Sequence, residues 1–159
     1  MHYEFVPGDE IVIAPGRTVK RIRALVEIAA LGVSAGDVGG YVEADKNLRG
    51  DAQVFGDAQV SGNAWVFGDA QVSGDAQVSG NARVSGNAAI FWASRVGTEN
   101  GTFTAYKTKD GGIEITRGCF RGSIDEFLAA SEKKHDDRTH LEYRLLVEVA
   151  YSRLTTPKE

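Results

Sequence analysis

Residues 50–91 read GDAQVF, GDAQVS, GNAWVF, GDAQVS, GDAQVS, GNARVS and GNAAIF, which are seven consecutive hexads of the form G-[DN]-A-x-[VI]-x. The aliphatic position continues in phase on both sides of this block, from Val42 to Val96. A period of six excludes an amphipathic helix, whose apolar residues recur every three or four positions. The x-V-x triplet alternates as a short strand does, and the G-[DN] pair tolerates a sharp turn. The repeat therefore predicts a β-solenoid.

These hexads resemble the repeats of the hexapeptide-repeat proteins. The resemblance implies a left-handed parallel β-helix of triangular section, in which three hexads make one coil of 18 residues. Residues 42–97 would then form a short β-helix of about three coils. Because so short a solenoid has two open ends, it must be capped or must oligomerise.

The segments that flank the repeat have the patterns of caps, so the expected fold class is mainly β. Residues 1–41 predict an N-terminal β cap, and residues 98–159 predict a C-terminal cap of one hairpin and two helices. The hairpin turn falls at Asp110, Gly111 and Gly112.

Two helices are expected after this hairpin. Ser123 and Glu126 have the spacing of a capping box, ahead of a helix that runs to about Lys134. A second helix is expected over residues 137–154. One apolar stripe of that second helix contains Leu141, Leu145 and Val149, with Leu146 beside it.

Composition and charge limit the possible partners. Lys and Arg total 18 against 22 Asp and Glu, a net charge of −4, which argues against direct nucleic-acid binding. Cys119 is the single cysteine, so no internal disulfide can form. The N-terminus lacks the pattern of a signal peptide, and no apolar run approaches the roughly 20 residues that cross a bilayer. We therefore expect a soluble cytoplasmic protein without membrane contact.

A second, looser resemblance concerns the flanks. The stretches GDVGGYVEADKNL and YKTKDGGIEITRGCFRGSIDEF, on either side of the repeats, are similar to those of a group of small phage and prophage proteins with the same three-part layout. This resemblance implies a mobile-element origin, with the host cytoplasm as location, but supplies no activity.

Catalytic chemistry finds little support in the chain. Many hexapeptide-repeat proteins are acyltransferases with a histidine base at the coils, whereas His2, His135 and His140 all lie outside the repeats. Cys119 could be a nucleophile paired with a histidine, but a buried packing thiol is favoured. The spacing of His135 and His140 is poor for a shared metal. We expect no catalytic residue, no metal site and no cofactor.

The outward positions of the repeat are the candidate binding residues. In an 18-residue coil one face is polar, with Tyr41, Gln59 and Gln77. A second face carries Phe55 and Phe91. The third face has Trp65 and Phe67 at mid-height, between rows that hold Asn47 with Arg49 and Arg83 with Ser85. Trp and Arg are enriched at interface hot spots. The predicted partner- or oligomer-binding residues are therefore Trp65, Phe67, Arg49, Arg83, Phe55 and Phe91, and a cap that folds back over them is the alternative.

Three further features have structural interpretations. The corner residues are all Asp or Asn and could form a ridge that mimics DNA, but turn formation is favoured because both residues tolerate the left-handed conformation. A basic cluster of Arg17, Lys20, Arg21 and Arg23 is taken as a solvated strand face rather than a phosphate site. Trp92 follows the strict repeats and is expected beneath the C-terminal cap.

Three functions from different classes remain open. The first is a non-catalytic phage-type binding protein that inhibits a host macromolecule, such as a nucleic-acid-directed defence complex of the CRISPR type. The second is an acyltransferase that uses a base other than histidine. The third is a self-assembling structural protein, so the expected partner is a host defence complex or a further copy of the chain.

Overall fold

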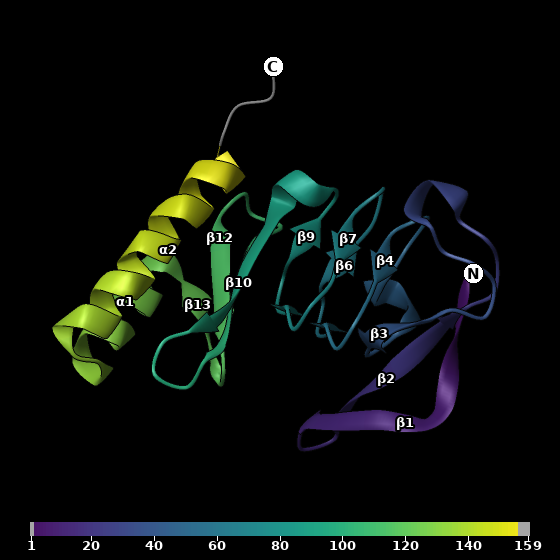
Figure 1. Ribbon diagram of the computed structural model, residues 1–159, viewed down its shortest axis with the longest axis horizontal. Coiled ribbons are helices and arrows are strands. Elements are labelled where there is room, and N and C mark those ends of the chain that lie inside the picture. The colour runs from purple at the N-terminus through teal and green to yellow at the C-terminus, as the bar shows by residue number, and fades with distance from the viewer. Residues whose placement is uncertain (1, 156–159) are drawn as a thin grey trace.

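The computed structural model describes residues 2–155, and a stack of two-residue strands forms its centre (Figure 1). Each strand lies parallel to the strand three hexads later, with Gln53 opposite Gln71, Gln59 opposite Gln77 and Trp65 opposite Arg83. The strands are β4 (Gln53–Val54), β5 (Gln59–Val60), β6 (Trp65–Val66), β7 (Gln71–Val72), β8 (Gln77–Val78) and β9 (Arg83–Val84). The pairs are therefore β4 with β7, β5 with β8 and β6 with β9, as a solenoid with an 18-residue turn requires.

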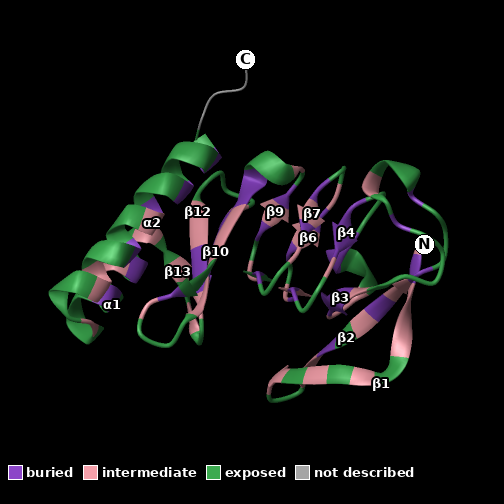
Figure 2. Ribbon diagram, viewed as in Figure 1, coloured by how far each residue is buried: buried purple, intermediate pink, exposed green. Residues whose placement is uncertain are grey.

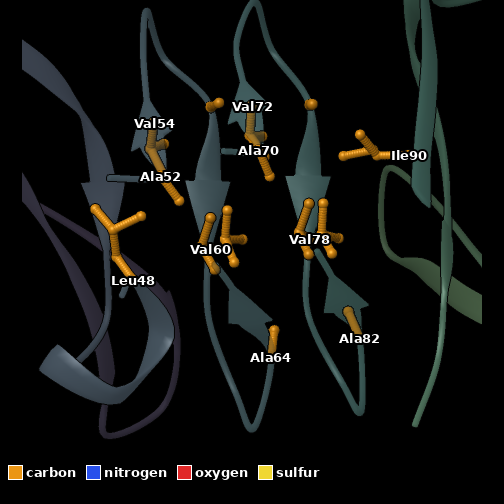
Figure 3. Packing of buried hydrophobic residues seen from close by; sticks show 14 of the residues in the cluster. Leu48, Ala52, Val54, Val60, Ala64, Ala70, Val72, Val78, Ala82 and Ile90 are labelled. Atoms are coloured by element: carbon orange, nitrogen blue, oxygen red, sulfur yellow. The ribbon is translucent and has the colours of Figure 1, made fainter. Parts of the chain in front are cut away.

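The aliphatic and alanine positions of the hexads fill the centre of this stack. Figure 3 shows these side chains directed toward one another from successive strands. Val54, Val60, Val66 and Val72 are fully buried, as are the hexad alanines from Ala52 to Ala82, each two positions before a valine. The regular alternation of one small and one branched side chain therefore makes a continuous core, as the repeat predicts.

Glycine, rather than Asp or Asn, adopts the left-handed conformation at the corners. Gly56 has φ +62°, and a Cβ added there would lie 3.1 Å from the carbonyl oxygen of Gly74. The same conformation recurs at each hexad glycine from Gly50 to Gly80, whereas Asp57 and its equivalents do not have positive φ. Of the G-[DN] pair that predicts each sharp turn, it is therefore the glycine, the residue without a side chain, that takes the left-handed conformation.

The N-terminal region extends one sheet of the stack with antiparallel strands. Its elements are β1 (Tyr3–Ala14), β2 (Arg17–Ala24), β3 (Val38–Val42) and the short 3₁₀ turns η1 (Ala29–Leu31) and η2 (Asp45–Asn47). β1 and β2 form a hairpin, β2 pairs with β3, and β3 pairs in parallel with β5. One sheet of order β1-β2-β3-β5-β8 therefore runs from the hairpin into the repeats.

The C-terminal region forms a separate antiparallel sheet. Its strands are β10 (Ile90–Val96), β11 (Gly101–Lys107), β12 (Ile113–Arg117) and β13 (Phe120–Ser123), in chain order. β11 and β12 are the predicted hairpin, and the Gly111 N–H donates to the Thr108 carbonyl in its turn. The repeat pattern reaches Val96, yet Val96 lies in antiparallel β10, because the Gly86 backbone is extended and η3 (Asn87–Ala89) replaces a corner. The parallel strand pairs therefore end with β9.

Two helices, α1 (Ile124–Lys134) and α2 (Asp137–Thr155), lie against the C-terminal sheet (Figure 1). The predicted capping box is present, since the Ser123 Oγ accepts from the Glu126 N–H and the Glu126 carboxylate accepts from the Ser123 N–H. Among residues 2–155 no helix is long and apolar enough to cross a membrane.

The apolar stripe predicted for the second helix faces outward. Figure 2 shows much of α2 as exposed. Leu141, Leu145 and Val149 are 48%, 53% and 46% exposed, so they do not form the packed side of the helix. The buried residues of α2 are Tyr143, Val147, Ala150 and Leu154.

The C-terminal sheet packs on the last turns of the stack. Tyr106 of β11 is fully buried and belongs to the same core cluster as the valines of the repeat. Its hydroxyl donates to the Glu114 carboxylate at 2.6 Å. Trp92 of β10 is half-buried against that cluster. The apolar end of the stack is thus covered by aromatic side chains from the C-terminal strands.

Candidate interaction surface

The third outward face of the repeat is the candidate surface. Trp65 and Phe67 stand on either side of the buried Val66, so the alternation of β6 directs both rings away from the core. Both side chains are half-buried. Their ring centroids are 6.5 Å apart with an interplanar angle of 81°, an edge-to-face contact. The face therefore presents one connected aromatic pair.

Two arginines pack on the Trp65 indole. The guanidinium carbon of Arg49 lies 4.0 Å from the ring centroid, and that of Arg83 lies 3.9 Å from it. Arg49 belongs to the row before β6, since its N–H donates to the Val66 carbonyl, and Arg83 belongs to the row after it. Each cation–π contact of this kind is worth about 0.5–2 kcal/mol. The stack of three side chains thus runs across the rows of the solenoid.

Backbone carbonyls hold both guanidinium groups in place. Arg83 Nη1 donates to the carbonyls of Asn63 and Ala82, each at 2.8 Å. Arg49 Nε donates to the Lys46 carbonyl at 3.2 Å. Within residues 2–155 no carboxylate oxygen lies within 4.0 Å of either guanidinium. The two cations are therefore ordered without an acidic partner.

Asn47 does not lie on this face as the sequence pattern expects. Its side chain is fully buried, because η2 occupies the position where a strand would have turned it outward. Its Nδ2 donates to the carbonyls of Gly62 and Ala64, and its Oδ1 accepts from the Ala44 N–H. Asn47 is thus a structural residue.

Phe55 and Phe91 lie away from the Trp65 cluster. Phe55 packs against the small cluster of Ala24, Ile28 and Val33 in the N-terminal region. Phe91 packs in the C-terminal cluster, with its ring centroid 6.4 Å from that of Phe103. The structure therefore brings together Trp65, Phe67, Arg49 and Arg83 and assigns the other two aromatic residues to packing with the flanking regions.

The cysteine and the two helical histidines have separate surroundings. Cys119 is exposed in the turn between β12 and β13, so the expected buried thiol was wrong: a tight turn leaves no core for it. The His135 ring lies 5.4 Å from that of Tyr143, and His140 Nδ1 is 2.9 Å from the Ser131 hydroxyl. Residues 2–155 contain no group of three His, Cys, Asp or Glu side chains placed to hold a metal.

The three arginines of the basic cluster of β2 are paired with carboxylates. Arg17 donates to Glu43 through Nε and Nη2, and Arg21 donates to Asp9 at 2.7 Å. Arg23 contacts Glu4 at 2.6 Å, and Lys20 lies over the Phe5 ring. The Arg17 guanidinium lowers the pKa of the Glu43 carboxyl. These cations connect the hairpin to itself and to the repeats, which leaves few donors for a phosphate.

A polar groove follows the first face of the repeat, between the N-terminal hairpin and the β12–β13 turn. Residues that line it include Arg17, Gln59, Gln77, Cys119 and Arg121. The 18-residue period of the repeat predicts the polar residues at the bottom of this groove, Gln59 and Gln77. The sides of the groove come from flanking segments, whose positions the repeat does not determine.

Short parallel strands that repeat every three hexads around an Ala and Val core define the β-solenoid class. The model of the YdcK beta solenoid repeat matches residues 58–74 and 76–90, so this part of the chain is similar to that repeat. No curated protein and no solved structure matches the chain.

Proposed function

We propose that this chain is a non-catalytic binding protein of phage type, which engages a host macromolecule through its third face and inhibits it in the host cytoplasm. In this proposal the repeat is a short left-handed parallel β-helix of about three coils that serves as a rigid scaffold. The observation that supports it best is the half-exposed Trp65, held between Arg49 and Arg83 with Phe67 at its edge.

The order of this cluster favours binding. Tryptophan and arginine are the residue types that contribute most at protein interfaces, particularly near the centre of a contact. Binding usually costs about 0.5–1.5 kcal/mol for each flexible side chain that becomes ordered. The stack already orders Arg49, Trp65 and Arg83 in the free protein. Binding of a partner would therefore cost less free energy for the ordering of these side chains.

The class of partner follows from charge and from the resemblance of the flanks. A net charge of −4 favours a protein over a bare nucleic acid. Similarity to small phage proteins makes a defence complex directed at nucleic acid, as in an anti-CRISPR, the host target we propose.

The test compares the wild type with the double variant Trp65→Glu/Phe67→Glu in a bacterial host that carries an active CRISPR system. Plasmid clearance by the host is the readout for inhibition, and a tagged pull-down from the same cells identifies the retained complex. We expect the wild type to suppress clearance and to retain the complex, and the double variant to lose both activities.

A matched control uses the same positions of the next hexad, Gln71→Glu/Ser73→Glu, which adds the same charge to another face. It should behave as the wild type. Light scattering on all three proteins separates self-assembly from partner binding. If the Trp65 variant only falls from oligomer to monomer, the face is an assembly contact and the proposed function is wrong; turnover of acyl-CoA by the wild type would also contradict it.

A further inference from the structure

The indole of Trp65 is not free to stack on a ligand. Arg49 and Arg83 approach it from the two adjacent rows, and the guanidinium carbon of each lies at van der Waals distance from the indole ring. Recognition of a base or an aromatic ring normally uses the open face of such a side chain. At this surface the guanidinium groups, rather than the indole face, are what a partner would meet.

Each guanidinium keeps unused hydrogen-bond donors. Arginine has five N–H groups in a planar fork. Among the described residues, Arg83 uses only Nη1 and leaves Nε and Nη2 without an acceptor, while Arg49 uses only Nε and leaves both Nη atoms. Two adjacent nitrogens on each group thus match the two oxygens of a carboxylate.

The two stacked arginines also lack a carboxylate partner. The exposed Lys46 ammonium, at the corner before Arg49, donates to the Asn63 side-chain oxygen at 3.1 Å. Together with the Arg17 guanidinium, its charge also contributes to the lowered pKa of the Glu43 carboxyl. Asp51 is the corner acid two residues after Arg49, and its Oδ1 lies 3.3 Å from His2 Nδ1 rather than against the arginine. By contrast, Arg17, Arg21 and Arg23 of the hairpin each have a carboxylate partner. Among residues 2–155, Arg49 and Arg83 have no carboxylate within ion-pair distance, so their two guanidinium groups form a short positive strip on a protein of negative net charge.

We propose that this strip binds two carboxylates of an acidic segment of a protein partner, one at Arg49 and one at Arg83. The proposal rests on the proposed binding function and names the chemistry of its partner. Two rows of a sheet separate the arginine backbones by about 10 Å, and carboxylates on alternate residues of an extended chain are about 7 Å apart before their side chains spread. A Glu-x-Glu segment therefore spans the stack.

Tryptophan fluorescence gives a direct test. The chain has two tryptophans, so Trp92→Phe leaves Trp65 as the only indole. The probe is the end-blocked peptide Gly-Glu-Gly-Glu-Gly, and the control probe is the same peptide with Gln in place of Glu. We expect the Glu peptide to cause a saturable change in Trp65 emission and the Gln peptide to bind at least about tenfold more weakly. Raising NaCl to 1 M should weaken the Glu peptide by a similar factor.

Variants of the two arginines locate the site. In the Trp92→Phe background, Arg49→Gln/Arg83→Gln should abolish the fluorescence response to the Glu peptide. Arg49→Lys/Arg83→Lys keeps the positive charges but lacks the paired N–H donors of the guanidinium group, so it should bind the Glu peptide about threefold to tenfold more weakly. Since these changes alter Trp65 emission itself, calorimetric titration with the Glu peptide serves as the second measurement. Circular dichroism and thermal unfolding confirm that each variant is folded.

Equal binding of the Glu and Gln peptides, or no saturable response to either, would overturn the proposal. Tighter binding of single-stranded oligonucleotides than of the Glu peptide would assign the strip to nucleic acid instead and equally overturn it. The outcome is separable from that of the proposed function. If the host complex is retained by Arg49→Gln/Arg83→Gln, the inferred chemistry is wrong but the binding function stands. If the Glu peptide binds but no host complex is inhibited, the reverse holds.

Discussion

At the scale of single residues, Asn47 has a structural role that the repeat pattern does not predict, because the pattern places its side chain on the surface. Its side-chain amide pairs with three backbone groups, the buried carbonyl of Ala64 and the partly buried carbonyl of Gly62 and N–H of Ala44. A buried polar group without a partner costs about 1–3 kcal/mol. Asn47 therefore fastens the segment before the repeats to the first rows.

Replacement of Asn47 by alanine should lower the free energy of unfolding by about 2–4 kcal/mol, because it leaves these backbone groups unpaired. The measurement is urea unfolding followed by circular dichroism. Asn81→Ala is the matched control, since Asn81 is an exposed corner asparagine, and it should change stability by no more than about 0.5 kcal/mol. Equal effects of the two substitutions would refute the role assigned to Asn47.

The 18-residue phase was sufficient to predict which outward side chains meet on the third face. It placed Trp65 and Phe67 between Arg49 and Arg83, and the structure has the four together. It could not indicate that Asn47 turns inward, because that depends on a 3₁₀ turn in place of a strand. Nor could it show that both arginines lie against one indole, since side-chain rotamers are not encoded in a repeat.

At the scale of elements, β2 is connected to the rest of the molecule through its charged side chains. Arg17 reaches Glu43 just beyond β3, and the Glu43 carboxylate also accepts from the Gly62 N–H at 2.7 Å. Arg21 donates to the Tyr41 hydroxyl and to Asp57 at the corner before β5. The hairpin is therefore oriented on the repeats by ion pairs in addition to its strand pairing.

The Glu43 contacts predict an acid-sensitive contribution to stability. Because the folded pKa of Glu43 is lowered, chiefly by Arg17, its contribution is present above the ordinary pKa of 4.5 and is lost as the pH falls through the folded value. Glu43→Gln should cost about 0.5–1 kcal/mol at pH 7, since the pair is partly exposed, and the deficit should shrink below pH 4.5. Urea unfolding between pH 3 and pH 7 measures it.

Glu10→Gln is the control for this experiment. Glu10 is exposed on the same hairpin and has no ion pair among residues 2–155, so its substitution should leave the dependence of stability on pH nearly unchanged. A deficit of Glu43→Gln that is constant from pH 3 to pH 7 would contradict the assignment to the ionised carboxylate.

The helices show where an apolar pattern alone is ambiguous. Leu141, Leu145 and Val149 recur at steps of four, a spacing that drifts around a helix of 3.6 residues per turn. The side that packs, Tyr143 through Leu154, has steps of four, three and four and so follows the helix more closely. The extents of both helices were predicted closely, and the start of α1 was marked by Ser123 and Glu126, which form a defined hydrogen-bond pattern.

At the scale of the whole molecule, Tyr106 connects two cores. Its ring is buried with the valines of the repeat, while its neighbour Ala105 belongs to the core beneath the helices. Burial is the main cause of the raised pKa of the Tyr106 hydroxyl, followed by its hydrogen bond to Glu114. The covered end of the stack and the helical region are therefore expected to unfold together.

Tyr106→Ala should remove this connection at a cost of about 3–5 kcal/mol, whereas Tyr106→Phe keeps the ring and should cost only about 1 kcal/mol. In wild type, tryptophan fluorescence and far-ultraviolet circular dichroism should report one coincident urea transition. In Tyr106→Ala the two curves should separate, with a smaller slope for each transition. Coincident curves at an unchanged midpoint would show that the cores are joined elsewhere.

The continuous ladder from β3 through β8 has a consequence for how such a protein changes in size. Each 18-residue turn lies on the next in the same register, and adjacent rows are about 4.8 Å apart. Duplication of one turn would leave the hairpin contacts at one end and the Tyr106 contacts at the other unaltered. The distance between the hairpin and the pair of helices can therefore lengthen or shorten only by whole turns of the solenoid.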